Sequence, residues 1–309
     1  MKNTLCKYSI NKNGFVLSLV LWIVAAMMLL ALLYVRLSKE ESNIYKQMHH
    51  KLTVELTSQS LFEKLAFYVA TGTFTETTVQ NRVKSLPAKL SLNNNDYNIS
   101  FEKTNCEFSL LDHSALFNLR NLRTLQQAQL FIEQNSHRNY PLSQIYLDWI
   151  DPDDLTRLNG AEKSDYLLNN YQYIPDNFIS FQNPNALFLL KGFSDIDKNS
   201  TNIIKNYFTT YGRSSINVYL LNQKMLKAFF PVLSNTQITN LLRLKIENPK
   251  IYYKKFYFLP NESFGKYLSK VITFSIDCYK GEAKSHLETI VDFHTTKNYS
   301  WTFLEYKKN

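Results

Sequence analysis

The segment Phe15–Val35, FVLSLVLWIVAAMMLLALLYV, governs the interpretation of the whole chain because it contains no charged residue. About 20 residues of this kind rise roughly 30 Å as an α-helix, which is the thickness of the hydrocarbon core of a bilayer. The sequence therefore predicts a transmembrane helix over residues 15–37.

The charges on either side of this span predict its orientation. Three lysines and no acidic residue precede it, at Lys2, Lys7 and Lys12. The charges that follow it nearly cancel: Arg36, Lys39, Glu40 and Glu41. By the positive-inside rule, the amino terminus is expected in the cytoplasm. In a bacterium, this makes the chain a single-pass inner-membrane protein whose carboxyl-terminal part lies in the periplasm.

A cleaved secretory signal peptide is the first alternative for this segment. The apolar region of a signal peptide is usually only 7–15 residues long, which is shorter than Phe15–Val35. A small-x-small cleavage site normally follows it, and Tyr34-Val35-Arg36-Leu37 contains none. The apolar pattern also continues past the span, at Ile44, Met48, Leu52, Leu56, Leu61, Leu65 and Tyr68. No proline occurs before Pro87, so we expect one helix from about 15 to 70, whose periplasmic half, 38–72, presents this face to protein.

The composition indicates a folded protein. Of the 309 residues, 45% are hydrophobic and 14% are aromatic, which is too much apolar surface for a disordered chain. The formal net charge is +9, but three of the positive charges precede the span and the others form no dense basic block. Such a distribution is typical of a solvated surface, so no nucleic-acid partner is expected.

Alternating apolar residues predict strands in two separate regions. Tyr97, Ile99 and Phe101 alternate before the polar stretch EKTN, and Cys106, Phe108 and Leu110 alternate after it, as in a hairpin. Alternation returns near the carboxyl terminus, at Ile272, Phe274, Ile276, Cys278, Val291, Phe293, Trp301 and Phe303.

The simplest architecture that joins the two regions is α+β. Residues 73–125 would form the first part of a small antiparallel sheet, and residues 265–309 would add its carboxyl-terminal strands. The intervening residues, 126–264, would be a large α-helical insertion. Within it, Ser215–Leu244 predicts two short helices around a turn that contains no glycine.

The three cysteines are Cys6, Cys106 and Cys278, and no CxxC pair suggests zinc. If the amino-terminal residues are removed, Cys106 and Cys278 remain in a compartment that can be oxidising. A disulfide between them and two unpaired buried thiols are both consistent with the sequence.

The stretch Tyr146–Tyr166, YLDWIDPDDLTRLNGAEKSDY, contains a cluster of acidic residues. Five of its carboxylates offer the hard oxygen ligands that calcium prefers: Asp148, Asp151, Asp153, Asp154 and Glu162. The spacing differs from that of an EF-hand loop. Acidic caps at the start of a helix would use some of the same residues, so the sequence leaves both interpretations open.

No sequence motif indicates an enzyme. GxxxxGK, GxSxG, HExxH and GxGxxG are all absent from the sequence. Asp112, His113 and Ser114 are adjacent, but neighbouring residues rarely converge on one substrate atom, and turn chemistry explains them better. We therefore expect no catalytic residues.

The basic leader that ends at Gly14, followed directly by Phe15 and an apolar helix, resembles the class III signal of type IV pilins and type II secretion pseudopilins. The resemblance implies that prepilin peptidase removes residues 1–14 and methylates the new amino terminus at Phe15. The family pattern places a glutamate at the fifth mature position, where this sequence has Leu19. The K subunits of type II secretion are the pseudopilins that lack this glutamate, in keeping with a place at the fibre tip.

The acidic stretch supports the same family, since Asp148-Trp149-Ile150-Asp151, followed by Gly160-Ala161-Glu162, is similar to a run in the K family of minor pseudopilins. Asn159 and Lys163 depart from the family pattern. The resemblance implies a pseudopilin fold with a SAM-like helical insertion that binds calcium.

By this resemblance, the chain would be a structural minor pseudopilin at the tip of the type II secretion pseudopilus, helping to initiate its assembly and to export folded proteins across the outer membrane. Expected partners are the I- and J-type minor pseudopilins, then the H-type, the major pseudopilin and prepilin peptidase. The alternative is a minor pilin of a type IV or competence pilus.

Overall fold

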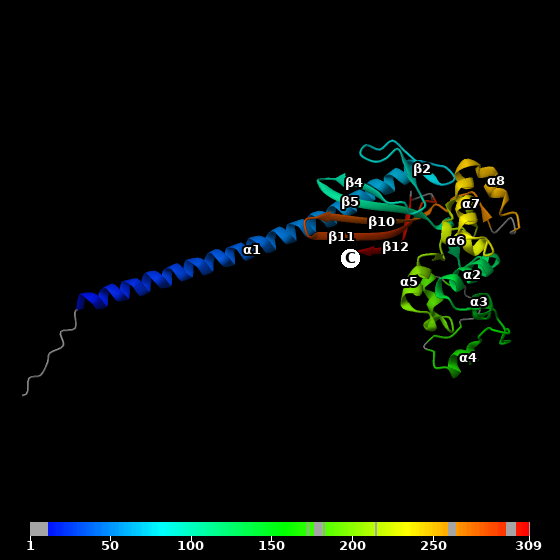
Figure 1. The fold of residues 1–309 in the computed structure, drawn as a ribbon, viewed down its shortest axis with the longest axis horizontal. Helices are drawn as coiled ribbons and strands as arrows, with labels where there is room; N and C mark the ends of the chain where they lie inside the picture. Colours follow the sequence, from blue (N-terminus) through cyan, green and yellow to red (C-terminus); the bar gives the residue numbers. More distant parts are fainter. Residues whose placement is uncertain are drawn as a thin grey trace, which may run out of the picture.

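A single helix of 60 residues, α1 (Lys12–Thr71), dominates the shape of the molecule (Figure 1). The computed structural model describes residues 12–171, 173–175, 181, 183–213, 215–258, 264–294 and 301–308. The prediction of one continuous helix through the span and beyond it is confirmed. Cys6 and most of the predicted leader lie outside the described residues, and the backbone of Gly14 and Phe15 belongs to the start of α1.

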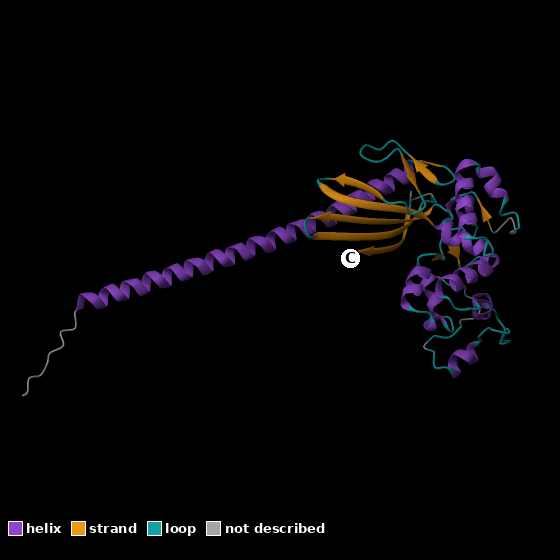
Figure 2. Cartoon of the chain, in the orientation of Figure 1, coloured by secondary structure: helices purple, strands orange, loops and turns teal. Residues whose placement is uncertain are grey.

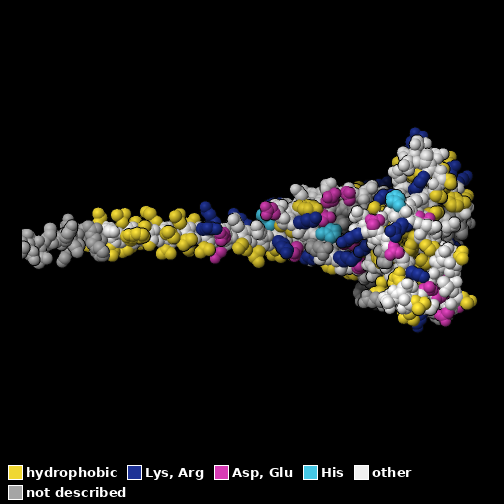
Figure 3. All heavy atoms as spheres, turned by 60° about the horizontal axis from the view of Figure 1, so that its bottom comes forward, with side chains coloured by type: hydrophobic (Ala, Val, Ile, Leu, Met, Phe, Trp, Pro, Cys, Tyr) yellow, Lys and Arg dark blue, Asp and Glu magenta, His cyan; other side chains and the backbone are white. Residues whose placement is uncertain are grey.

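The amino-terminal half of α1 is apolar on all sides. Its most apolar window has a mean hydropathy of 2.8, and none of that window is buried in the protein. In Figure 3 this part of the rod is covered with hydrophobic side chains until the first charged groups appear. Among the described residues, this is the one helix that is long and apolar enough to cross a membrane.

The carboxyl-terminal part of α1 packs against a five-stranded antiparallel sheet (Figure 2). The strand order is β12-β11-β10-β5-β4. The bounds are β4 Tyr97–Phe101, β5 Thr104–Asp112, β10 Val271–Lys280, β11 Ala283–Asp292 and β12 Thr302–Lys308. The two regions of alternating sequence therefore form one sheet, with β10 beside β5, as predicted.

One face of α1 packs into the core beneath this sheet. Its buried side chains are Val54, Leu61, Phe62, Leu65, Ala66, Tyr68 and Val69. They meet the inward residues of the strands, and the rings of Phe62 and Phe274 pack edge to face with centroids 5.4 Å apart. Each fully buried large apolar side chain contributes about 1.5–3 kcal/mol, so this layer holds the anchor firmly to the sheet.

A row of apolar residues at four-residue spacing begins before this face and does not pack within the chain. We call them the apolar row: Ile44, Met48, Leu52 and Leu56. All four side chains are more than half exposed. A step of four residues turns a helix by about 400°, so such a row drifts by about 40° per step and moves away from the sheet. The prediction that this side of α1 faces protein is met within this chain by Leu61, Leu65 and Tyr68, and for the row it stays a prediction.

A small three-stranded sheet follows α1, in the order β1-β2-β3. Its strands are β1 Thr73–Phe74, β2 Thr78–Gln80 and β3 Lys89–Ser91. Tyr68 ties it to the end of α1, because the Tyr68 hydroxyl accepts a hydrogen bond of 3.0 Å from the backbone N–H of Asn81.

The helical insertion lies between β5 and β10, at the end of the molecule away from the membrane span (Figure 1). Its α-helices are α2 Leu125–Ser136, α3 Leu142–Ile150, α4 Lys163–Leu168, α5 Lys198–Lys205, α6 Gln223–Phe229, α7 Asn235–Glu247 and α8 Pro249–Lys254. Two short parallel pairs connect its segments: β6 Phe117–Asn118 with β7 Phe208–Thr209, and β8 Ile216–Asn217 with β9 Phe264–Gly265.

The insertion has its own hydrophobic core, separate from the core beneath the sheet. Phe117 and Leu119 belong to it although they precede the predicted boundary at residue 126. The predicted helix pair of Ser215–Leu244 corresponds to α6 and α7. The observed fold is thus α+β, with the long helix, antiparallel sheet and helical insertion that the sequence predicts.

Asp112 and His113 form the junction between the sheet and the insertion. The buried Asp112 carboxylate accepts hydrogen bonds from the backbone N–H groups of Ser114, Ser269 and Lys270 and from both serine hydroxyls. This is the turn chemistry expected from the sequence. Burial raises the pKa of Asp112, and these hydrogen bonds oppose that shift.

His113 links the two units directly. Its Nδ1 lies 2.7 Å from the hydroxyl of Thr209 in β7, and its Nε2 lies 2.8 Å from the hydroxyl of Thr273 in β10. Burial lowers the pKa of His113 from 6.5 to about 4, so the folded protein holds a neutral imidazole at the junction.

His113 should make the protein less stable in acid. The unfolded chain binds a proton on His113 below pH 6.5, whereas the folded chain resists it until about pH 4. The free energy of unfolding therefore falls as pH drops through this interval, by about 3 kcal/mol from this residue. Denaturation of the full chain in detergent at pH 7, 6, 5 and 4 measures the effect.

The His113→Gln variant should lose that part of the pH dependence, whatever its stability at pH 7. A His49→Gln variant, changed at an exposed position on α1, should keep it. Equal slopes for wild type and His113→Gln between pH 6.5 and 4 would contradict the assignment.

Cys106 and Cys278 face each other across β5 and β10, and the structure joins them in a disulfide with Cα atoms 4.1 Å apart. The bond closes a loop with a sequence separation of 172 residues, which contains the whole insertion. Alkylation of the denatured, unreduced protein should therefore leave both residues unlabelled, and reduction should expose two thiols to the reagent. Cys106→Ala or Cys278→Ala should lower the free energy of unfolding by about 3 kcal/mol. Labelling of both cysteines without reductant would exclude the bond.

Candidate metal centre

The acidic cluster is built from the end of α3, the start of α4 and the loop between them. Asp148 lies in the last turn of α3, and Asp151 follows the helix with an extended backbone that ends it. Glu162 occupies the N-cap position of α4. The loop folds back on itself, so three acidic residues separated by up to 14 positions come together.

The three carboxyl groups are close and largely shielded from water. One oxygen from each of Asp148, Asp151 and Glu162 lies within 4.8 Å of the others. Asp148 is 0% exposed and Glu162 is 1% exposed, while Asp151 is partly buried. Buried carboxylates at this separation repel one another unless a cation or a proton lies between them.

Arg157, in the same loop, supplies one positive charge. Its Nη1 donates hydrogen bonds to Asp148 Oδ1 and to Asp151 Oδ2. Its backbone N–H donates to Asp148 Oδ2 at 3.1 Å. These carboxylates raise the pKa of Arg157 above its already high ordinary value.

The remaining carboxylate oxygens of the cluster have no partner among the described residues. They are Asp151 Oδ1, Glu162 Oε1 and Glu162 Oε2, and all three are buried. Burial, followed by repulsion from the neighbouring aspartates, raises the pKa of Glu162 to about 7. Buried polar atoms are normally hydrogen-bonded, so three unpartnered oxygens in one place fit a bound cation.

Two of the five predicted ligands lie outside this cluster. Asp153 and Asp154 are exposed on the loop, and Asp153 Oδ1 accepts a hydrogen bond of 2.9 Å from the backbone N–H of Leu155. The structure thus brings together Asp148, Asp151 and Glu162. The helix cap at α4 uses Asp165, whose Oδ2 accepts the N–H of Glu162 at 3.0 Å.

Aromatic side chains and a glycine hold the cluster in place. Trp149 packs edge to face on Tyr166 and Phe181, with ring centroids 5.3 and 5.6 Å apart. Gly160 lies directly against Asp148, and a Cβ at this position would come within 1.8 Å of Asp148 Oδ2. The glycine therefore leaves room for the buried carboxylate.

Sequence reasoning missed Arg157. The available signal was its position as the one basic residue between Asp148 and Glu162. A lone arginine in an acidic run is a common surface feature, however, so only the fold shows that its side chain points into the cluster.

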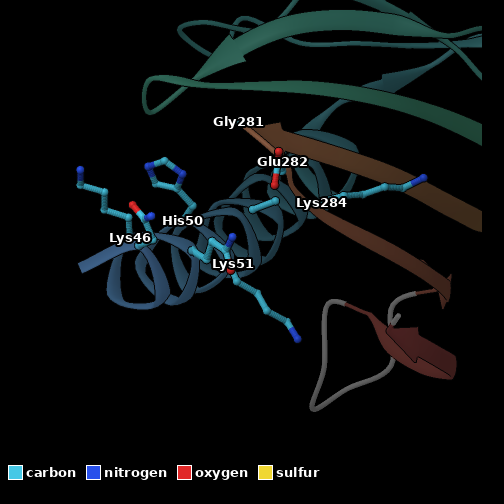
Figure 4. Close-up of a pocket in the computed structure, with 9 residues that line it drawn as sticks. Lys46, His50, Lys51, Gly281, Glu282 and Lys284 are labelled. Carbon is cyan, nitrogen blue, oxygen red and sulfur yellow. The ribbon is translucent and has the colours of Figure 1, made fainter. Parts of the chain in front are cut away.

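Away from the acidic cluster, a cavity of about 720 Å³ lies between α1 and the turn that joins β10 to β11 (Figure 4). Lys46, His50 and Lys51 approach it from α1, and Glu282 and Lys284 from the hairpin. Its lining is polar and mostly basic, with three lysines, one histidine and one glutamate.

No protein-family model matches the sequence, and a search of curated proteins finds no significant match. The structure is similar to a chain in the crystal structure of the GspK-GspI-GspJ complex from the type 2 secretion system of enterotoxigenic Escherichia coli. The TM-score is 0.54 at 14% sequence identity, and the match covers 87% of this chain and 99% of that chain. The likeness extends over the helix, the sheet and the insertion together, so the two chains share a fold.

Gly160→Ala should disturb the cluster selectively. The new methyl group must displace the Asp148 carboxylate or the loop, because both are closely packed. We expect a loss of about 2 kcal/mol in the free energy of unfolding, typical of overpacking. Gly265→Ala is the matched control, because the nearest atom to its new Cβ would be 3.9 Å away. Equal stability of the two variants would contradict the tight packing at Gly160.

Proposed function

We propose that this chain is a K-family minor pseudopilin that forms the tip of a type II secretion pseudopilus, helps to initiate its assembly and thereby serves the export of folded proteins. The observation that carries the proposal is the combination of α1, the antiparallel sheet and the helical insertion in one chain, shared with a chain of the GspK-GspI-GspJ complex. A fold match that covers 99% of that chain supports a common role.

The apolar character of the span supports a place at the tip. No carboxylate interrupts Phe15–Val35, and Leu19 lies where the pilin pattern has glutamate. A carboxylate in hydrocarbon is costly unless it meets a positive group, such as the amino terminus of a subunit ahead of it in the fibre. A subunit with no neighbour ahead has no such partner, so leucine suits the end position.

The proposal includes processing and orientation. Prepilin peptidase would cut after Gly14 and methylate Phe15, leaving α1 anchored in the inner membrane with its sheet and insertion in the periplasm. The lysines ahead of the span support this orientation.

The apolar row gives the expected partners a surface on which to pack. Its four side chains are exposed on α1, from beyond the span to the first turn that packs on the sheet. The long helices of the I- and J-type minor pseudopilins would cover this row, followed by the H-type and the major pseudopilin. A minor pilin of a type IV or competence pilus is the alternative, and the structural likeness to a secretion complex favours the first assignment.

The role is structural rather than enzymatic. The acidic cluster brings together carboxylate oxygens at the spacing of a cation site, and we propose that Asp148, Asp151 and Glu162 bind calcium there. Their hard oxygens match its preference, with water and backbone groups completing the six to eight ligands it takes. The ion would fasten the start of α4 to the end of α3.

Co-purification tests the proposed function. The tagged full chain, expressed with prepilin peptidase and the minor pseudopilins of its host, should retain the I- and J-type subunits from detergent extracts. Its intact mass should correspond to a methylated chain that begins at Phe15. Met48→Glu should reduce the recovered partners at least fivefold, because it buries a carboxylate in an apolar contact.

Gln47→Glu is the matched control, since it adds the same charge at the neighbouring exposed position and should leave recovery unchanged. Exclusive recovery of type IV pilus subunits would favour the alternative. A retained leader would show that the chain is an ordinary signal-anchored protein.

A further inference from the structure

Arg157 occupies part of the space that a cation would take in the acidic cluster. Asp148, Asp151 and Glu162 together present six carboxylate oxygens. Three of them accept hydrogen bonds from Arg157, and the other three are buried without a partner. One guanidinium group therefore faces three buried or partly buried carboxyl groups, and it leaves half of their oxygens without a partner.

We propose that Arg157 and calcium exchange at this site, so that the guanidinium bridges Asp148 and Asp151 when calcium is absent and is displaced when the ion binds. The inference rests on the proposed calcium site. It assigns to Arg157 the role of an internal counter-ion, a positioning residue rather than a ligand.

The number of available oxygens supports exchange. With the guanidinium in place, three carboxylate oxygens are free, which is half or less of the six to eight that calcium takes. Withdrawal of the guanidinium releases Asp148 Oδ1 and Asp151 Oδ2 and brings the number to five. Asp148 Oδ2 still accepts the Arg157 backbone N–H, so the loop stays attached to α3 throughout.

Charge leads to the same conclusion. The ligand oxygens lie within 4.8 Å of one another, so an ion among them would lie beside Nη1 of Arg157. Two cations that contact the same carboxylates in a partly buried place repel strongly. Binding of a divalent ion therefore favours the departure of the monovalent one.

The exposure of the side chains shows which group can move. The Arg157 side chain is 38% exposed, whereas those of Asp148 and Asp151 are 0% and 15% exposed. The guanidinium can thus turn into water while the carboxylates remain. The exchange would keep the loop folded both before and after the chain meets calcium.

Calcium affinity tests the exchange. The probe is Tb³⁺, whose emission Trp149 would sensitise from its position beside Asp148, and calcium displaces it in competition titrations of the full chain in detergent. Arg157→Gln should bind calcium at least tenfold more tightly than wild type, because a competing cation is removed. Arg157→Lys should fall between the two. Unchanged or weaker binding by Arg157→Gln would overturn the proposal.

Two variants serve as controls. Arg243→Gln makes the same chemical change in an exposed ion pair with Glu247 on α7 and should bind as wild type does. Glu162→Gln removes an unpartnered carboxylate and should weaken binding at least tenfold.

A second measurement uses the wild-type protein and so does not depend on how a variant folds. Phenylglyoxal modifies accessible guanidinium groups, and peptide masses report the rate at each arginine. Millimolar calcium should raise the rate at Arg157 several-fold over the rate in chelator and leave Arg243 unchanged. An equal or slower rate at Arg157 would overturn the exchange.

The outcomes separate the two proposals. If wild type binds calcium but Arg157→Gln has the same affinity and the phenylglyoxal rate is constant, the exchange fails and the calcium site stands. If neither Tb³⁺ nor calcium binds any variant at millimolar concentration, the calcium site itself fails. Co-purification with minor pseudopilins is independent of both.

Discussion

One face of α1, from Val54 to Val69, packs against β10 and β11, and this contact relates the membrane anchor to the folded part of the chain. The helix is continuous, so the part that packs against the sheet and the apolar part that precedes it are joined without a break. Apolar side chains on all sides of the first half suit lipid, and an apolar stripe on one side of the second half suits a sheet. The apolar row begins between these two parts and runs alongside the start of the sheet contact, and its exposed side chains leave room for other helices to pack.

Buried polar groups join the insertion to the sheet, and Leu220 of the insertion also packs into the core beneath the sheet. Asp112 collects five hydrogen bonds around the turn where β5 ends, and His113 places its two nitrogens on Thr209 and Thr273. Directional bonds of this kind fix an angle between two units more sharply than apolar contact does. These bonds hold the helical unit in one orientation relative to the sheet and α1.

The sequence was most informative where the spacing of apolar residues stayed regular along a whole element. The span, the β4–β5 hairpin and the β10–β11 strands follow from uninterrupted patterns, and they were predicted correctly. The apolar row and the buried residues Leu61, Leu65 and Tyr68 were assigned to one face of α1, but a four-residue spacing drifts by about 40° per step, so the two sets point in different directions. Phe117 and Leu119 were placed with the sheet because nothing local shows that β6 pairs with β7, about 90 residues later in the chain.

The acidic cluster shows a different limit. Five carboxylates in a short stretch predict a cation site, yet the composition does not show which of the five would be ligands. Burial separates them: Asp153 and Asp154 are exposed, and water solvates their charges, whereas Asp148 and Glu162 are withdrawn from water and need a compensating charge nearby. Gly160 makes that withdrawal sterically possible, and Arg157 offsets only part of its electrostatic cost. The three unpartnered oxygens result from the way the loop folds back onto α3, which no residue pattern within the loop specifies.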